Sequence, residues 1–267
     1  MMGPAPAKLN LALVVGPRRA DGKHELVTVF QRVDFGDRIT VEPARETTID
    51  GFPEDTIVRG ALALLDAPQG WRVTIDKHVP LAAGLGGGSS DAATALRLAN
   101  EQLDNPLPSE RLQELAAQVG ADVPFFLRDG PQLGTGDGTT LEPLDLPQDF
   151  AILLLLPKDV HKPSTAEVYA AFDRRGGDAG FDERAASLRS GVASVRRPRD
   201  LATLPPNDLA SSPLAAELRA HGAFRADVSG AGPTLYGLFH RTVDAKRAAG
   251  VLGHLGQTWI TVPAWYG

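Results

Sequence analysis

The sequence of 267 residues contains no cysteine. This absence excludes a disulfide framework, a cysteine-based zinc site and a thiol nucleophile. Six histidines are present, but they are scattered without the spacing of metal ligands.

Positive charge is also scarce. There are 27 lysines and arginines against 33 aspartates and glutamates, so the formal net charge is −6. Sequence-independent binding to nucleic acid or to an anionic membrane needs a basic surface, so neither partner is expected. A small anionic substrate is still compatible, because a few local lysines and arginines decide its binding.

Long apolar runs are missing as well. The sequence has no stretch of about 18 apolar residues, which a membrane-spanning helix would need. Residues 1–6 lack the basic segment and apolar run of a secretory signal, so we expect a cytoplasmic protein. The apolar share of 43% supplies a packed core, and the length suits one large domain or two ordinary ones.

Glycine, in contrast, is concentrated in one stretch, residues 80–91, which read PLAAGLGGGSSD. The pattern predicts a strand over Trp71–Lys77 before it and a helix over Asp91–Leu103 after it. Such a loop lets the backbone approach a bulky anion, and the first helical turn offers N–H groups and a favourable dipole. We predict a phosphate cradle, with a flexible turn as the alternative. The loop matches neither the Walker nor the Rossmann fingerprint well.

Two further places carry candidate polar groups. A predicted strand over Ala7–Val15 places Lys8 and Asn10 together on the face opposite its leucines. Spacing alone does not decide between a site and a solvated face. Asp122 follows a predicted helix over residues 109–119 and lies between small and apolar neighbours. It either pairs with another group or caps a helix, since aspartate is seldom buried without a partner.

The second half of the chain gives clear signals only in parts. A continuous apolar run over Ala151–Leu156 predicts a central strand. Ser164 and Glu167 form a predicted capping box that starts a helix. A second glycine loop, Ser229–Pro233, lies between two predicted strands.

Other segments are expected to be less regular. We interpret residues 130–140 as turns and much of residues 174–206 as a mobile surface loop, with a candidate helix over Asp182–Ser190. Asn207 and Asp208 are expected to begin the next helix. The predicted domain boundary divides the chain into residues 1–148 and 149–267.

Three separated blocks resemble, in order, the motifs of the GHMP kinases (galacto-, homoserine, mevalonate and phosphomevalonate kinases). The blocks are Pro6–Leu11, Pro80–Ala93 and Ser229–Pro233. Four sharper matches resemble the 4-diphosphocytidyl-2-C-methyl-D-erythritol kinase family within that superfamily. They are Arg19–Thr28, Gly86–Ala92, Gly120–Phe125 and Asn207–Leu209.

The resemblance implies an α+β fold of two lobes, with a βαβ-type nucleotide-binding lobe first, a ferredoxin-like lobe second and a cleft between them. It implies transfer of the ATP γ-phosphoryl group, with Mg²⁺, to a hydroxyl of 4-diphosphocytidyl-2-C-methyl-D-erythritol, in the non-mevalonate route to isoprenoid precursors. The alternative is another GHMP small-molecule kinase, of the homoserine or mevalonate kinase type. A monomer or a homodimer is expected.

By the same resemblance, Asp122 accepts the hydroxyl proton and Lys8 keeps that carboxylate ionised, since a nearby cation lowers the pKa of an aspartate. Asn10 hydrogen-bonds the substrate, His24 reads the cytosine edge and Tyr169 stacks on the base. The other implied substrate-binding residues are Lys23, Thr165, Gly230 and Gly232. The loop implied to wrap the ATP phosphates comprises Pro80, Leu81, Ala82, Ala83, Gly84, Leu85, Gly86, Gly87, Gly88, Ser89 and Ser90. The metal ligands stay unassigned, with Ser90 as a candidate.

One position departs from the family pattern, which has tyrosine where this chain has Lys23. Lysine is a poorer stacking platform than an aromatic ring. A stacked base contact is worth about 1–3 kcal/mol, so cytidine binding is expected to be weaker by about tenfold or more, without loss of activity. A catalytically impaired nucleotide-binding homologue is the corresponding alternative.

Overall fold

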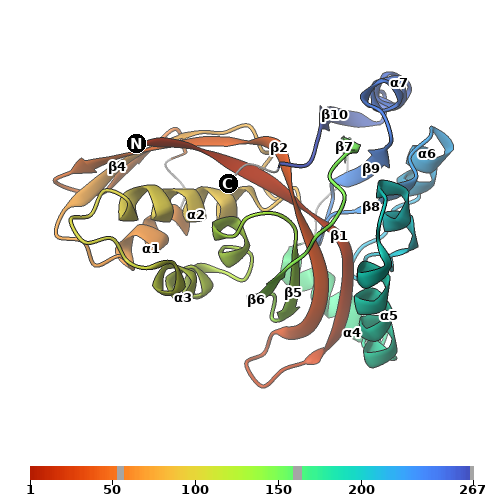
Figure 1. Cartoon of the computed structure of the whole chain (residues 1–267), viewed down its shortest axis with the longest axis horizontal. Helices are drawn as coiled ribbons and strands as arrows, with labels where there is room; N and C mark the ends of the chain where they lie inside the picture. Colours follow the sequence, from red (N-terminus) through yellow and green to blue (C-terminus); the bar gives the residue numbers. More distant parts are fainter. Residues whose placement is uncertain (53–56, 159–163, 265–267) are drawn as a thin grey trace.

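The computed structural model describes residues 1–52, 57–158 and 164–264. The chain forms two lobes, each built around one sheet with helices packed against it (Figure 1). This arrangement confirms the predicted α+β fold.

The first lobe has a six-stranded sheet in the order β3-β4-β2-β5-β6, and β1 pairs with β2 outside this path. The strands are β1 (Met2–Arg18), β2 (His24–Ala44), β3 (Thr48–Asp50), β4 (Gly70–Asp76), β5 (Gln132–Gly136) and β6 (Thr140–Pro143). The helices are α1 (Ile57–Ala63), α2 (Gly87–Asn100), α3 (Ser109–Val119) and the 3-10 turn η1 (Pro124–Leu127). Because β3 runs parallel to β4 and α1 connects them, this lobe contains the predicted βαβ unit.

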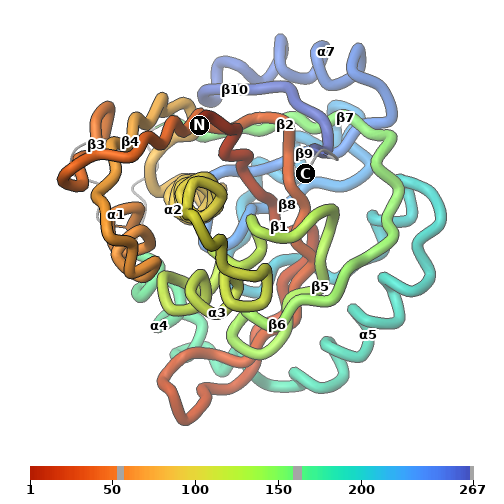
Figure 2. The backbone as a smooth tube through the Cα atoms, turned by 60° about the vertical axis from the view of Figure 1, so that its left-hand side comes forward, coloured from red at the N-terminus to blue at the C-terminus, as the bar shows by residue number. Residues whose placement is uncertain are grey.

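Strand β4 shows why this sheet forms. Trp71, Val73 and Ile75 alternate with exposed residues and are buried in the first-lobe core. Helix α2 lies on the same face and contributes alanines and leucines, among them Leu96. Figure 2 shows α2 end-on beside the strands that it covers. Small side chains let this helix approach the sheet closely, and its first turn is thereby fixed at the glycine loop.

The second lobe has a four-stranded antiparallel sheet in the order β10-β7-β9-β8. The strands are β7 (Ala151–Pro157), β8 (Arg225–Val228), β9 (Leu235–Phe239) and β10 (Gly256–Thr261). The helices are α4 (Thr165–Arg174), α5 (Phe181–Ser194), α6 (Leu214–Ala220), α7 (Thr242–Leu252) and the 3-10 turn η2 (Pro198–Thr203). The strand order and the helices between strands are those of a ferredoxin-like lobe, as predicted.

Strands β1 and β2 form one long hairpin that runs through the molecule and contacts both lobes (Figure 1). Its register shifts between Pro6 and Lys8 and again between Asn10 and Ala12. Such irregularities re-aim side chains. They occur on either side of residues 8–10, so Lys8 and Asn10 lie in a short regularly paired stretch between two irregularities.

Two expectations for local structure are wrong, and a third is confirmed in part. The candidate helix over Asp182–Ser190 is confirmed as part of α5, but the region 174–206 is not mostly a surface loop: it also contains η2, and Leu188 and Leu201 are fully buried because a stripe of well-spaced apolar residues lies among its arginines. Residues 130–140 include strand β5, since pairing with β2 overrides the turn preference of glycine. Asn207 begins no helix: it bridges to Leu13, and α6 starts only at Leu214.

Two other expectations are confirmed or refined. The capping box of Ser164 and Glu167 starts α4, with both reciprocal hydrogen bonds present. Helix α2 begins at Gly87, inside the glycine loop, and not at Asp91. The domain boundary after residue 148 stays a prediction, and that position lies in the connection between β6 and β7. No helix in the described part of the chain has the length and apolar character to cross a membrane.

Candidate active site

A cavity of about 670 Å³ lies where β1, β2, α4 and the two glycine loops meet. It gathers side chains from positions that are far apart in the sequence. The predicted site residues that line it are Lys8, Asn10, Lys23, His24, Gly84, Ser89, Asp122, Thr165, Tyr169 and Gly230. Gly232 and the rest of the Pro80–Ser90 loop are not among its lining residues.

Lys8 and Asp122 meet in this cavity. The Lys8 ammonium lies 3.2 Å from a carboxylate oxygen of Asp122, with the lysine side chain 5% exposed and the aspartate 35% exposed. The turn η1 beyond Asp122 has Val123 as its N-cap residue and takes no capping bond from a side chain. The carboxylate is therefore paired, and one side of it faces the open cavity.

A chain of hydrogen bonds holds Lys8 in place. Its ammonium donates to Asn10 Oδ1 at 2.7 Å, and Asn10 Nδ2 donates to Thr28 Oγ1 at 2.8 Å. Thr28 in turn donates to the Ala12 carbonyl. The ring of Phe30 lies 5.5 Å from the ammonium. Because these partners come from β1 and β2, the hairpin fixes the charged end of Lys8 within the cavity.

His24 and Tyr169 also line the cavity and stack on each other, with ring centroids 4.8 Å apart and planes 25° apart. Asp173 Oδ1 lies 2.7 Å from His24 Nε2 and fixes the orientation of the imidazole. Burial, together with the charge of Asp122, raises the pKa of Tyr169 to about 12. The tyrosine therefore stays neutral at ordinary pH and offers a flat apolar face beside a polar ring.

Lys23 lines the rim of the same cavity. Its ammonium lies 2.5 Å from a carboxylate oxygen of Asp137, which belongs to the β5–β6 turn. Burial alone would raise the pKa of Asp137, but hydrogen bonds from Lys23 and Thr139 lower it to about 2. By its place in the sequence, Lys23 stands where the family resemblance leads us to expect an aromatic ring.

The first glycine loop passes directly beside the second. A Cβ on Gly84, whose φ is +80°, would lie 2.5 Å from the Ser229 carbonyl oxygen and 2.8 Å from that of Gly232. Ser229 also donates a hydrogen bond to the Gly84 carbonyl at 3.0 Å. Only glycine fits such a close crossing of two backbones. Gly232 thus shapes the site from outside the cavity wall.

The two serines of the loop have different environments. Ser89 lines the cavity, whereas the Ser90 hydroxyl is fully buried and has no hydrogen-bond partner among the described residues. The described residues contain no group of three or more histidines or carboxylates that would hold a metal. Magnesium typically binds through one or two carboxylates and substrate phosphates. Asp122 and Ser89 fit that role better than Ser90.

Sequence reasoning missed an ion cluster behind the loop. Lys77 donates to Asp37 and to Asp91, both at 2.6 Å, and a Cβ on Gly87 would lie 3.0 Å from its ammonium. Burial would lower the pKa of Lys77, but the two carboxylates raise it. Burial raises the pKa of Asp91 to about 7, and the adjacent Asp37 adds to the shift against the opposing charge of Lys77.

Two further cavity residues were also missed. Asp173 lies four residues beyond Tyr169 on α4, so helical spacing places both on one face and offered a usable signal. Asp137 had no such signal, because it reaches Lys23 only through the fold of the β5–β6 turn.

Sequence profiles and known structures agree on the relationship of this chain. The GHMP kinases N terminal domain profile matches residues 55–130, and the GHMP kinases C terminal profile matches residues 210–256. A 4-diphosphocytidyl-2-C-methyl-D-erythritol kinase of Desulfitobacterium hafniense is 37% identical over 96% of this chain and 93% of its own length. The corresponding kinase of Prosthecochloris aestuarii is 35% identical over 92% and 91%.

Among solved structures, a 4-(cytidine 5'-diphospho)-2C-methyl-D-erythritol kinase superposes with a TM-score of 0.77 at 32% identity, covering 99% of both chains. Leishmania major mevalonate kinase in complex with R-mevalonate superposes with a TM-score of 0.74, covering 100% of this chain and 97% of the other. Its 15% identity shows a shared fold alone. The chain is a member of the 4-diphosphocytidyl-2-C-methyl-D-erythritol kinase family of GHMP kinases.

Proposed function

We propose that this protein transfers the γ-phosphoryl group of ATP to a hydroxyl of 4-diphosphocytidyl-2-C-methyl-D-erythritol. The observation that carries the proposal is the 3.2 Å contact between Lys8 and Asp122 within a cavity that also holds the two glycine loops and the His24–Tyr169 stack. The family relationship supplies the identity of the substrate.

Asp122 is the proposed general base. One side of its carboxylate faces the cavity, where it accepts the proton of the attacking hydroxyl. Lys8 stabilises the ionised carboxylate and the negative charge that spreads over the transferring phosphoryl group. Asn10 holds the Lys8 ammonium through its Oδ1 atom and lines the same wall of the cavity.

The backbone of the Pro80–Ser90 loop and the first turn of α2 are proposed to hold the ATP phosphates, because the helix dipole favours negative charge there. Magnesium, when bound, neutralises phosphate charge, with Asp122 and Ser89 offering oxygen atoms. We propose the cytoplasm as the site of the reaction, because ATP is its phosphoryl donor.

Within the same cavity, the cytosine is proposed to meet His24 and Tyr169. The imidazole offers hydrogen bonds to the polar edge of the base, and the tyrosine ring offers a stacking face. Thr165, on the same helix as Tyr169, lines this part of the cavity. Lys23 and Asp137 close the rim.

The test is phosphoryl transfer by the purified protein, followed by ³¹P NMR with ATP and the cytidylyl substrate. Replacing Asp122 by asparagine is expected to lower kcat at least about 100-fold, the usual scale of a general base. The KM for ATP is expected to change little. Asp104→Asn, which alters an exposed aspartate, is the matched control and should keep the wild-type rate.

Homoserine and mevalonate serve as competing acceptors, because the other GHMP kinases phosphorylate such alcohols. Turnover of either in preference to the cytidylyl substrate would overturn the substrate assignment. An Asp122→Asn variant with most of the wild-type kcat would overturn the assignment of the base while leaving the kinase activity in place.

A further inference from the structure

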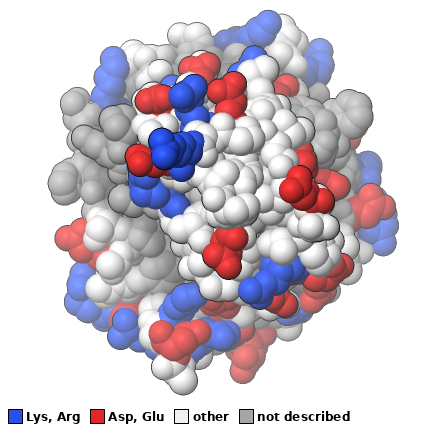
Figure 3. Space-filling view, turned by 90° about the vertical axis from the view of Figure 1, so that its left-hand side faces the viewer, with Lys and Arg blue, Asp and Glu red and all other residues white. Residues whose placement is uncertain are grey.

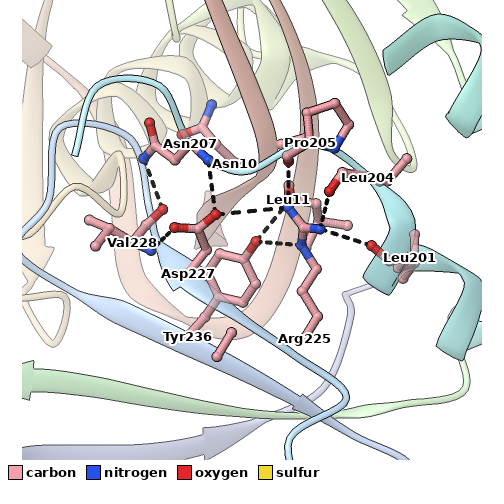
Figure 4. Close-up of polar contacts among 12 residues, drawn as sticks. Asn10, Leu11, Leu201, Leu204, Pro205, Asn207, Arg225, Asp227, Val228 and Tyr236 are labelled. Atoms are coloured by element: carbon pink, nitrogen blue, oxygen red, sulfur yellow. Dashed lines mark hydrogen bonds and ion pairs between the residues drawn. The ribbon is translucent and has the colours of Figure 1, made fainter. Parts of the chain in front are cut away.

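A buried arginine lies at the junction of the second lobe with β1. Arg225 on β8 is 6% exposed, yet its guanidinium makes direct hydrogen bonds in several directions (Figure 4). It donates to the carbonyls of Leu201, Leu204 and Pro205 at 3.0, 2.7 and 2.8 Å. These bonds fix the segment that leads from η2 to Asn207.

The same guanidinium is linked to β1 through a tyrosine. Arg225 Nε donates to the Tyr236 hydroxyl at 3.1 Å, and that hydroxyl donates to the Leu11 carbonyl at 2.9 Å. Both contacts are buried.

Asp227, two residues further along β8, lies on the same face of the strand as Arg225. Its Oδ2 lies 3.9 Å from Arg225 Nη2 and accepts a hydrogen bond from the backbone amide of Asn207 at 2.9 Å. Its Oδ1 accepts one from the Val228 amide at 2.8 Å. Figure 4 shows the carboxylate between Asn207 and the guanidinium. Both carboxylate oxygens are therefore engaged, and asparagine in this place would lose one acceptor.

Asn207 connects Asp227 to the wall of the cavity. Its side-chain amide donates to the carbonyl of Val228 at 3.0 Å and to that of Gly230 at 2.6 Å, and its Oδ1 accepts from the Leu209 amide at 2.9 Å. Gly230 and Leu209 both line the cavity. One side chain thus holds two pieces of the cavity wall at the same time.

The wall at Gly230 lies directly against the catalytic lysine. A Cβ on Gly230 would lie 3.1 Å from Asn10 Oδ1 and 3.4 Å from Lys8 Nζ. The preceding residue of the loop, Ser229, accepts a hydrogen bond on its hydroxyl oxygen from the backbone amide of Asn10 at 3.4 Å. A shift of this loop therefore changes the space around the Lys8 ammonium.

A buried ion pair is a poor way to gain stability, because desolvation offsets most of the attraction and apolar residues of the same volume often do as well. The energetic cost of burying Arg225 and Asp227 is explained if the pair fixes the position of neighbouring residues. We propose that the Arg225–Asp227 pair is a positioning device for phosphoryl transfer, which sets Asn207 and through it the Gly230 loop against Lys8 and Asn10. The inference rests on the proposed function.

The test compares Asp227→Asn with Tyr236→Phe. Each variant removes one partner from the same buried network, but only the first loosens Asn207. Asp227→Asn is expected to lower kcat about tenfold or more, since small misplacements of reacting groups are costly, with a change in the KM for ATP of less than about threefold. Tyr236→Phe is expected to lower the melting temperature while keeping kcat within about twofold of wild type, because a lost buried hydrogen bond affects stability alone.

Hydrogen exchange measured by mass spectrometry gives a readout that does not depend on turnover. The Gly232 amide bonds the Ser229 carbonyl at 2.9 Å within the loop. Asp227→Asn should speed exchange in peptides that cover residues 229–233, whereas Tyr236→Phe should not.

Equal loss of kcat in both variants, or unchanged kcat and loop exchange in Asp227→Asn, would overturn the proposal. Should the wild-type protein show no kinase activity, the proposed function fails, and the exchange experiment still decides whether Asp227 holds the loop.

Discussion

Lys23 and Asp137 place a fixed pair of charges at the rim of the cavity, where the family pattern has a tyrosine. The pair leaves His24 and Tyr169 as the aromatic side chains at this end of the cavity in the part of the chain that the structure describes. The base of the substrate is therefore expected to stack on one face only.

Replacing Lys23 by tyrosine should restore a second stacking surface. The KM for the cytidylyl substrate is expected to fall about tenfold, because a stacked base contributes about 1–3 kcal/mol. The KM for ATP should not change. Asp137→Asn is the control, since it removes the ion pair without adding a ring. A Lys23→Tyr variant with a higher KM for the substrate would contradict the stacking argument.

Asp91 gives a second prediction for a single residue. Its pKa is raised to about 7 by burial and by Asp37, so the folded protein holds a proton that the unfolded chain releases near pH 4. The stabilisation is complete below that lower value and is lost as the pH rises through about 7. The melting temperature of the wild-type protein should therefore fall between pH 5 and about pH 8.

Asp91→Asn mimics the protonated side chain, because its amide donates to Asp37 while its oxygen accepts from Lys77. Differential scanning fluorimetry across this range should show a flatter profile for the variant and a higher melting temperature than wild type at the alkaline end. Parallel profiles would exclude Asp91 as the titrating group.

Among the structural elements, the Pro80–Ser90 loop depends most visibly on a single backbone crossing. Gly84→Ala is expected to abolish ATP binding, because the new Cβ would collide with the carbonyls of Ser229 and Gly232 at a left-handed φ of +80°. Gly60→Ala is the control. It lies in α1, where an added Cβ meets open space, so it should raise stability by about 0.5–1 kcal/mol. Isothermal titration calorimetry with ATP and thermal melts separate the two effects.

The elements that sequence predicted well are those whose signal is local. The alternation in β4, the apolar run in β7 and the capping box of α4 were each readable from neighbouring residues. The glycine-rich β5 was not, because its partner β2 lies about a hundred residues away in the chain and decides its conformation. The helix α5 was predicted only over Asp182–Ser190, because the arginines around its apolar stripe obscured its full extent.

The residues of the site also divide into those with a local sequence signal and those without one. Lys8, Asp122 and the two glycine loops were found through short motifs, and the structure brings all of them together. Asp37, Lys77 and Asp91 could not be joined from sequence, since nothing in their spacing places three ions behind one loop. The Arg225–Asp227 pair was equally hidden, because its partners are mostly backbone carbonyls and amides.

At the scale of the whole molecule, one apolar core connects both sheets. The cluster that includes Leu9 and Val29 of the hairpin also includes Leu154 and Tyr236 of the second lobe. Because this cluster contains residues of both lobes, the lobes are joined by apolar packing within the molecule, and we expect them to unfold together. On the surface, acidic and basic side chains are interleaved around the face in Figure 3.

Tryptophan fluorescence tests this expectation, because Trp71 reports on the first lobe and Trp259 on the second. The variant Trp259→Phe/Trp265→Phe keeps Trp71, and the variant Trp71→Phe/Trp265→Phe keeps Trp259. In each variant, the fluorescence and far-UV circular dichroism transitions in urea should coincide. Trp265 lies outside the described residues and is removed from both proteins to leave one reporter in each. A fluorescence transition that precedes the circular dichroism transition in either protein would show that the lobes unfold separately.

The long β1–β2 hairpin limits how such an enzyme can open. Lys8, Asn10 and His24 all project from this single ribbon, which is paired into the first sheet and packed against the second lobe. A wide swing of one lobe away from the other would have to bend the ribbon that carries the reactive groups. We therefore expect ligands to enter and leave through local movements at the cavity mouth, with the spacing of the catalytic groups nearly the same in the empty and the loaded enzyme.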